Sequence, residues 1–378
     1  MKKKTVIIFS HYVKNSDSKY LIYTHNHAKE YVKKGYNVIT FAPFSVFPII
    51  GLLKKNNKFV MDGVTIYNNR RLSISKYLKN FFINFNGLFY FLSVIFKVKK
   101  IVKEEDVILF DAHNFDCEGY TAYLLKKIYP DIPTLITFHG SDLNKALSNK
   151  QDIKRLKTIG KTINYYVCVS DKLKKQLKKI NIRNVKTIYN GIIFHKITEK
   201  AKMKKIISVG DLIPSKNFSL LIQSFFEFSK KYNNYTLEII GEGYLKEDLQ
   251  KEIKKYHLEK KVKLLGYLEN NEVYKKLTEA SIFILVSKPE GFGIVYPEAM
   301  YCGCITIGTK NEGIDGFIKD KVNGFLVNPE QEKIIELLEY IIKNNCSQII
   351  NKAKEDSKKL SWNENCNQYL SLIGDELK

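Results

Sequence analysis

Glu290 and Glu298 are the residues of this sequence whose type and spacing most clearly suggest chemistry. Both carboxylates fall in a stretch that is otherwise apolar, and burying an unpaired carboxylate costs on the order of several kcal/mol. Gly291 and Gly293 lie between them and allow the backbone to approach a ligand closely. The pattern therefore predicts that the two carboxylates serve a binding or catalytic site.

A strand, a loop and a short helix must position these two side chains. The apolar run 281–287 is expected to be a strand, with the loop 288–293 at its carboxyl end and both glutamates at the rim of a ligand cleft. A helix is expected to begin at Ile294 and end at Gly303, with Pro297 in its first turn, where a missing N–H costs little. The start of a helix attracts anions. Two carboxylates around an anion site suit a sugar nucleotide, one binding ribose hydroxyls and the other sugar hydroxyls.

Short β-rich apolar runs alternate with longer amphipathic segments along the whole chain, which is typical of α/β folds with parallel sheets. The runs that we expect to be strands are TVIIFS, NVITFAP, DVILFDAH, PTLITFHG, YYVCVS, VKTIYN, KIISVGD, YTLEIIGEG, KVKLLGY, SIFILVS, CITIGT and GFLV. A polar, charged stretch at 194–205 separates two complete series. We therefore expect two doubly wound Rossmann-like domains facing across a cleft, 1–195 and 196–378, with the last helix a candidate for packing back on the first domain.

The composition limits the class of protein. A chain of 378 residues favours two domains, and the formal net charge of +23 suits a polyanionic partner or reflects a general use of lysine. No zinc-finger spacing, RNA-recognition signature or basic–aromatic stripe favours nucleic acid. The six cysteines form no Cys-x-x-Cys pair, so we expect reduced thiols and a cytoplasmic protein. The first apolar run is short for a signal peptide and is expected to be a strand.

Residues 77–102 are rich in aromatic side chains and end in Lys97, Lys99 and Lys100. A membrane span needs about 20 predominantly apolar residues, and polar residues interrupt the first half of this segment. Two other interpretations are a buried helix pair and a surface that touches an anionic membrane, where lysines beside aromatic residues are typical.

The segment PEGFGIVYPEAMYCG closely resembles the Glu–seven residues–Glu signature of retaining glycosyltransferases with the GT-B fold, especially glycosyltransferase family four. Further segments that resemble this family, in family order, are TFHGSD, YVCVSDKLKKQL, TIYNGI, SVGDLIPSKNFSLLIQSF, LEIIGEGYLKEDL, VKLLGYL, NEGIDGFIKDKVNGFLV and LSWNENCNQYL. The likeness covers nearly the whole chain and is weaker before residue 135. It implies a GT-B fold and sugar transfer from a nucleoside-diphosphate sugar.

The resemblance also implies roles for individual residues. Glu298 matches the residue that binds the nucleotide ribose, and Glu290 matches the one facing the hydroxyls of the transferred sugar. Lys216 would neutralise the diphosphate, and His139 would reach the reaction centre from the first domain. The remaining donor-binding positions that the family pattern implies are Gly241, Tyr267, Phe292, Gly293, Ile294 and Val295. We expect the other six histidines to be structural.

Two departures from the family concern the phosphate contacts. Asp211 stands where members carry an arginine, so one of two diphosphate cations is missing. The glycine pair expected after the first strand is replaced by SHYVKNSDSKY, a loop that commonly touches donor phosphate and acceptor.

The resemblance implies a hexosyltransferase-type enzyme that retains anomeric configuration, with UDP the favoured base and a glycan or lipid-linked cell-envelope acceptor. No Asp-x-Asp occurs in the chain, so no metal or other cofactor is expected. The expected location is cytoplasmic, with peripheral contact to the inner face of an anionic membrane as an option. The alternative function is a non-catalytic or epimerase-type GT-B protein that binds sugar nucleotides.

Overall fold

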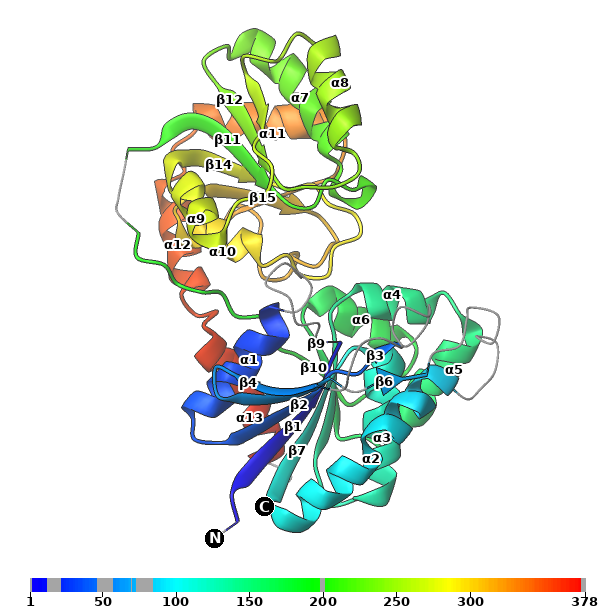
Figure 1. Ribbon diagram of the computed structural model, residues 1–378. Coiled ribbons are helices and arrows are strands. Elements are labelled where there is room, and N and C mark those ends of the chain that lie inside the picture. The colour runs from blue at the N-terminus through cyan, green and yellow to red at the C-terminus, as the bar shows by residue number, and fades with distance from the viewer. Residues whose placement is uncertain are drawn as a thin grey trace. The chain divides into compact units, whose positions relative to one another are not determined.

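The computed structural model describes residues 2–11, 22–45, 57–68, 70–72, 84–197 and 201–374. The chain divides into two compact units, one of Met1–Gly191 with Trp362–Lys378 and the other of Ile192–Ser361 (Figure 1). Each unit is built on a sheet with helices on both faces, parallel throughout in the second unit and parallel except for one edge strand in the first. The predicted α/β class with two Rossmann-like units is confirmed.

The sheet of the first unit follows the order β10-β9-β8-β7-β1-β2-β5-β4. Its strands are β1 (Lys4–Phe9), β2 (Asn37–Phe41), β4 (Asn57–Met61), β5 (Val64–Asn68), β7 (Asp106–His113), β8 (Thr134–Phe138), β9 (Tyr165–Cys168) and β10 (Val185–Thr187). All pairs are parallel except β4 with β5. Two short strands, β3 (Phe44–Ser45) and β6 (Arg70–Arg71), form a separate parallel pair.

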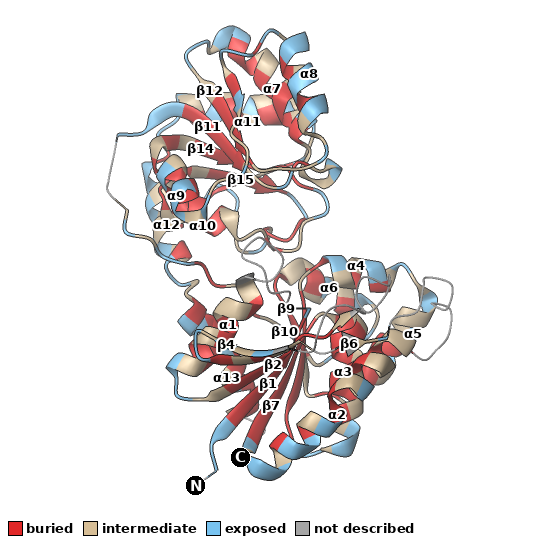
Figure 2. Cartoon of the chain, in the orientation of Figure 1, coloured by how far each residue is buried: buried red, intermediate tan, exposed pale blue. Residues whose placement is uncertain are grey.

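Helices cover both faces of this sheet, which is why its central strands are continuous apolar runs (Figures 1 and 2). The helices are α1 (Ile22–Lys33), α2 (Phe85–Glu104), a π-helix (Phe115–Gly119), α3 (Tyr120–Ile128), α4 (Ser141–Leu147), α5 (Lys150–Ile159), α6 (Asp171–Lys179) and α13 (Trp362–Gly374). Helices α1 and α13 pack together on one face, and α2 and α3 pack together on the other. Asn84 begins α2 by accepting a hydrogen bond from Gly87 N at 2.9 Å.

The second unit has a six-stranded parallel sheet in the order β13-β12-β11-β14-β15-β16. The strands are β11 (Met203–Val209), β12 (Thr236–Ile240), β13 (Val262–Leu264), β14 (Ala280–Ile284), β15 (Ile305–Thr309) and β16 (Phe325–Val327). The helices are a 3-10 turn (Pro214–Lys216), α7 (Phe218–Lys231), α8 (Lys246–Lys255), α9 (Asn270–Glu279), α10 (Val295–Tyr301), α11 (Gln331–Lys343) and α12 (Ser347–Ser357). The strand order reverses at β11, and ligands of such sheets bind at the carboxyl ends of the strands beside the reversal.

The division between the units differs slightly from the boundary expected after residue 195. Residue 192 already belongs to the second unit, and the segment from Trp362 belongs to the first. The reason is packing, because Trp362, Tyr369 and Ile373 of α13 are buried in the first unit. The final helix, α13, therefore packs in the first unit, as the sequence allowed for the last helix.

The described part of the aromatic segment 77–102 begins at residue 84 and forms most of α2. Residues 77–83 lie outside the described residues. In the part of the chain that the structure describes, no helix combines the length and apolar character needed to cross a bilayer.

Candidate functional site

The carboxylate of Glu290, on the loop after β14, is held by three donors. Lys216 Nζ lies 2.6 Å from Oε2, and Ser287 Oγ donates to the same oxygen at 3.0 Å. The backbone N–H of Gly291 donates to Oε1 at 3.1 Å. Glu290 is therefore fixed in one orientation, with a lysine compensating its charge.

Two hydrogen bonds join the loop after β11 to the loop after β14 and so place Lys216. The N–H of Lys288 donates to Ser215 O, and the side-chain amide of Asn217 donates to Val286 O, both at 2.7 Å. Because β11 and β14 are neighbours at the reversal of strand order, Lys216 and Glu290 meet at the carboxyl edge of the sheet.

Two glycines, one in this loop and one in the loop after β15, are required by close contacts. Gly293 has φ +78°, and a Cβ there would lie 2.6 Å from the ring of Tyr296. A Cβ on Gly313 would overlap the carbonyl of Gly291, so the loop after β15 lies directly against this one. From that loop the buried Glu312 accepts a hydrogen bond from Glu290 N at 2.8 Å. Glu312 thus fixes the backbone of Glu290, a role that the sequence reasoning missed.

Glu298 lies in the first turn of α10 and is 8% exposed, which is deeper than the rim position expected from the sequence. Burial raises its pKa to about 7, and the hydrogen bond from Asn270 Nδ2 to Oε1, 3.3 Å long, acts in the opposite direction. The side-chain oxygen of Asn270 is 2.6 Å from His195 Nε2. Glu298 is thus a buried acceptor with one amide donor.

The other predicted donor-binding positions lie at or beside the carboxyl edge of the same sheet. Gly241 follows β12 with φ +143°, and a Cβ there would overlap the carbonyl of Gly210 at the end of β11. Tyr267 is 50% exposed, and its hydroxyl donates to Glu269 at 3.2 Å. Ile294 and Val295 begin α10, after the buried Phe292. Asp211 is exposed just beyond β11.

His139 follows β8 in the first unit, where Asp142 organises its loop. Asp142 Oδ1 accepts hydrogen bonds from the N–H groups of His139 at 3.1 Å and Gly140 at 2.9 Å. Burial raises the pKa of Asp142 to about 6 against the effect of these donors. The Nε2 atom of His139 is 3.0 Å from His113 Nδ1, and the ring packs on Tyr23. Burial, followed by His113, holds the pKa of His139 well below its usual range.

The structure therefore brings Lys216 and Glu290 into direct contact at one sheet edge and places His139 in the other unit. His113, which contacts His139, is a residue of this arrangement that the family pattern alone did not indicate. The sequence does hold a signal for His113. The motifs DAH and FHG stand at the carboxyl ends of β7 and β8, and these strands are parallel neighbours whose carboxyl ends meet at one edge of the sheet. Among the described residues, His27, Asp111 and His113 are close enough together to hold a metal ion.

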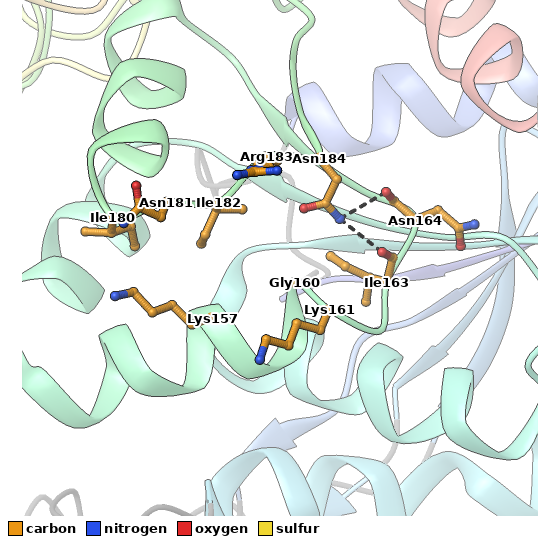
Figure 3. A pocket seen from close by; sticks show the side chains of 10 residues that line it. All are labelled: Lys157, Gly160, Lys161, Ile163, Asn164, Ile180, Asn181, Ile182, Arg183 and Asn184. Atoms are coloured by element: carbon orange, nitrogen blue, oxygen red, sulfur yellow. Dashed lines mark hydrogen bonds between the residues drawn. The ribbon is translucent and has the colours of Figure 1, made fainter.

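A pocket of about 610 Å³ in the first unit lies apart from this site (Figure 3). Its lining comes from residues that precede β9 and β10, including Lys157, Lys161 and Arg183. Asn184 closes one side by donating to the carbonyls of Ile163 and Asn164. The pocket is therefore at the amino ends of these strands, whereas His139 is at a carboxyl end.

Comparison with known proteins agrees with this class of fold. Residues 22–195 match the family model "Glycosyltransferase Family 4", and residues 191–358 match "Glycosyl transferases group 1". The chain is 30% identical over 304 residues to an uncharacterized glycosyltransferase of Methanocaldococcus jannaschii, covering 78% of this chain and 82% of that protein. It belongs to this family of glycosyltransferases, so the resemblance read from its motifs is confirmed.

Two further comparisons extend this result. Over 160 residues the chain is 34% identical to the N-acetylgalactosamine-N,N'-diacetylbacillosaminyl-diphospho-undecaprenol 4-alpha-N-acetylgalactosaminyltransferase of Campylobacter jejuni, covering 40% of this chain and 42% of that protein. The crystal structure of Anabaena HepE in complex with UDP and glucose has a TM-score of 0.71 at 17% identity, over 98% of this chain and 99% of that one. The GT-B fold is thereby shown.

Proposed function

We propose that this glycosyltransferase transfers a hexose from a UDP-sugar to a hydroxyl of a glycan or lipid-linked cell-envelope acceptor, with retention of anomeric configuration. The observation that carries the proposal is the 2.6 Å contact between Lys216 and Glu290 at the carboxyl edge of the second sheet. A cation and a carboxylate side by side are what a sugar diphosphate needs, since one neutralises phosphate and the other accepts sugar hydroxyls.

The donor-binding roles follow from chemistry and position. Glu298 accepts hydrogen bonds from the ribose hydroxyls, and Glu290 accepts them from hydroxyls of the transferred sugar. Lys216 contacts the diphosphate. Its ammonium group, which pairs with Glu290 in this structure, is then shared between Glu290 and the phosphate oxygens. The base lies against Gly241 and Tyr267, and the diphosphate and sugar follow the backbone of 292–295.

The proposed reaction begins with departure of the nucleoside diphosphate through an oxocarbenium-like state. The acceptor hydroxyl then attacks from the face that the diphosphate leaves, which retains the configuration. Lys216 stabilises the growing negative charge of the leaving group, and Glu290 positions the sugar rather than attacking it. His139 acts at the reaction centre through its ring nitrogen Nδ1, which has no hydrogen-bond partner among the described residues. No metal ion is needed at the diphosphate in this scheme.

The proposed donor and acceptor have separate support. UDP is favoured because the structurally similar HepE was crystallised with UDP and glucose. A lipid-linked acceptor is favoured because the Campylobacter relative acts on a diphospho-undecaprenol substrate, as its name states. All six cysteines are free and buried, which suits a reducing cytoplasm, and the basic outer face of α2 suits the inner face of an anionic membrane.

A product assay tests the proposal. The purified chain is incubated with a panel of UDP- and GDP-sugars and an undecaprenyl-diphosphate-linked sugar, without added Mg²⁺ or Mn²⁺, and free nucleoside diphosphate and glycolipid are measured. We expect release with a UDP-hexose, and the proton coupling of the new anomeric centre should match that of the donor. Conversion of the donor to an epimer without transfer, or binding without turnover, would instead support the alternative function. An inverted product would contradict the retaining mechanism.

A further inference from the structure

Three buried side chains with metal-ligating atoms converge at the carboxyl end of β7 in the first unit. His27 comes from α1. Asp111 and His113 lie two positions apart at the carboxyl end of β7 and are therefore on the same face of the strand. Their exposed fractions are 1%, 0% and 2%. Asp111 Oδ2 lies 3.1 Å from His27 Nε2 and 3.5 Å from His113 Nε2, and the three ligand atoms all lie within 4.8 Å of one another.

The protonation of His27 Nδ1 is determined by its neighbours. Asn365 on α13 donates its amide Nδ2 to Tyr189 O at 2.8 Å, so its carbonyl Oδ1 is the atom that faces His27 Nδ1 at 2.7 Å. An amide oxygen only accepts, and His27 Nδ1 must therefore carry the hydrogen. In the neutral His27 ring, Nε2 then carries a lone pair and faces Asp111 Oδ2, which is also an acceptor. Two acceptors therefore face each other with no hydrogen between them.

Two further atoms of the cluster lack a hydrogen bond. Asp111 Oδ1 and His113 Nε2 are both buried, and neither has a hydrogen-bond partner among the described residues. An extra proton on His27 would satisfy the contact with Asp111 Oδ2 but would leave His113 Nε2 without a hydrogen-bond partner among the described residues. A divalent cation would instead engage both imidazole nitrogens and the carboxylate together.

We propose that His27 Nε2, Asp111 and His113 Nε2 bind one divalent transition-metal ion, with zinc the best match. Two imidazoles and a carboxylate are a donor set that zinc prefers. Zinc–ligand bonds of about 2.0–2.1 Å at tetrahedral angles place neighbouring donor atoms about 3.3 Å apart. The separations of 3.1 and 3.5 Å lie on either side of that value.

The neighbours of the two histidines complete the arrangement. Metal-binding histidines usually donate their other ring N–H to a fixed acceptor. Asn365 Oδ1 is that acceptor for His27, and His139 Nε2, 3.0 Å from His113 Nδ1, is the acceptor for His113. The bound ion would therefore join α1 and α13 to β7. It would also fix His139 with its own hydrogen on Nδ1. This inference concerns binding in the first unit and does not depend on the proposed sugar transfer.

Metal content of the intact chain is the direct test. The full chain, with a purification tag free of histidine, is produced in zinc-supplemented medium, purified without chelator and measured by elemental mass spectrometry. We expect about one zinc per chain, and Co²⁺ exchanged into the site should give the visible absorption bands of a tetrahedral centre. A folded parent chain that holds less than a tenth of an equivalent of metal and shows no Co²⁺ bands would overturn the proposal.

Variants locate the ion. Asp111→Asn and His113→Gln should each reduce bound zinc at least tenfold, while His257→Gln, an exposed histidine of the second unit, should leave it unchanged. Circular dichroism of each variant establishes that it is folded. Should a variant fail to fold, the parent decides the question, because zinc added to the chelated parent should raise its unfolding temperature. Full zinc occupancy in both folded cluster variants would overturn the assignment, as would an unfolding temperature that zinc does not change.

Discussion

Burial of Glu298 lowers the stability of the second unit when this carboxyl is ionised, the form that the proposed donor binding requires. The proposed ribose contact requires an ionised acceptor, whereas the described surroundings supply one amide donor and little solvent. The result is a pKa of about 7, well above the ordinary 4.5. A carboxylate in this position is costly in the absence of ligand, which is typical of residues kept for binding.

Glu298→Gln should separate these two effects. Because the folded pKa lies above the unfolded one, the proton contributes stability below about pH 4.5, and this contribution is lost as the pH rises to about 7. The stability of the variant relative to the parent should therefore increase by on the order of 2–3 kcal/mol between pH 4 and pH 8. At the same time, UDP affinity should fall by about one to two orders of magnitude, as for loss of a charge-assisted hydrogen bond.

Urea unfolding across this pH range and calorimetric titration with UDP measure both effects. Glu332→Gln, the same change in the first turn of α11 at an exposed position, is the matched control and should show neither. Equal pH dependence in parent and Glu298→Gln would contradict the raised pKa, and equal UDP affinity would remove Glu298 from the ribose site.

In the proposed donor site, Lys216 makes the diphosphate contact without the arginine that the family usually adds at position 211. Lys216→Ala should lower kcat by a factor on the order of a hundred, since the contact strengthens as the leaving group gains charge. Asp211→Ala should leave donor binding unchanged or slightly improve it, because an exposed carboxylate repels phosphate. Steady-state kinetics on both variants check this. A larger loss in Asp211→Ala than in Lys216→Ala would show that the loop is wrongly matched to the family.

At the scale of elements, helix α2 has one face packed in the first unit and another that is exposed. Tyr90, Val94 and Val98 are buried, whereas Leu92 and Phe96 are 52% and 80% exposed. Lys99 and Lys100 extend the exposed face. Lys97 does not, because its ammonium lies 4.8 Å from the ring centre of Tyr67, and burial lowers its pKa. The basic cluster expected from the sequence therefore reduces to the last two lysines.

Membrane attachment through this face can be tested with paired variants. Each lysine near an anionic surface contributes about 1 kcal/mol, so Lys99→Ala with Lys100→Ala should weaken binding to phosphatidylglycerol vesicles by roughly 30-fold. Phe96→Ala should weaken it further through lost apolar contact. Lys254→Ala with Lys255→Ala, an equally charged exposed pair at the end of α8, is the control. Vesicle co-sedimentation that falls equally in both double variants would show a general effect of charge rather than attachment by α2.

At the scale of the whole molecule, the chain returns to its first unit with α13, and this helix is part of that unit's core. Tyr369 is 2% exposed, packs on His27 and shares a hydrogen bond of 2.9 Å with Thr137. The single tryptophan of the chain, Trp362, begins the same helix and is buried. Its fluorescence therefore reports on the first unit.

Tyr369→Ala should destabilise the first unit by about 3–5 kcal/mol, as expected for loss of a large buried ring. The measurement is the denaturant midpoint of Trp362 fluorescence. Tyr369→Phe keeps the ring and removes only the hydroxyl, so its midpoint should fall much less, by about 1 kcal/mol of stability. An unchanged midpoint in Tyr369→Ala would mean that α13 contributes little to the first unit in solution.

The sequence by itself determined the class of fold, the family and the local placement of the second-unit site. Hydrophobic periodicity and composition are local properties of the chain, and all twelve apolar runs expected to be strands contain a strand in the structure. The spacing of glycine and proline likewise predicted α10, with Glu298 in its first turn. The proposed roles of Lys216, Glu290 and His139 remain predictions from the family pattern.

Only the tertiary structure decided which distant residues meet. Glu312 reaches the backbone of Glu290, Asn270 reaches Glu298, and His27 and Asn365 join Asp111 although they are far apart in the chain. The side chain of Lys97 lies over Tyr67 rather than on the exposed face of α2, and α13 belongs to the first unit. Such contacts depend on how strands are ordered and how helices pack on them, and side-chain burial and pKa follow from that packing. No local pattern in the sequence encodes them.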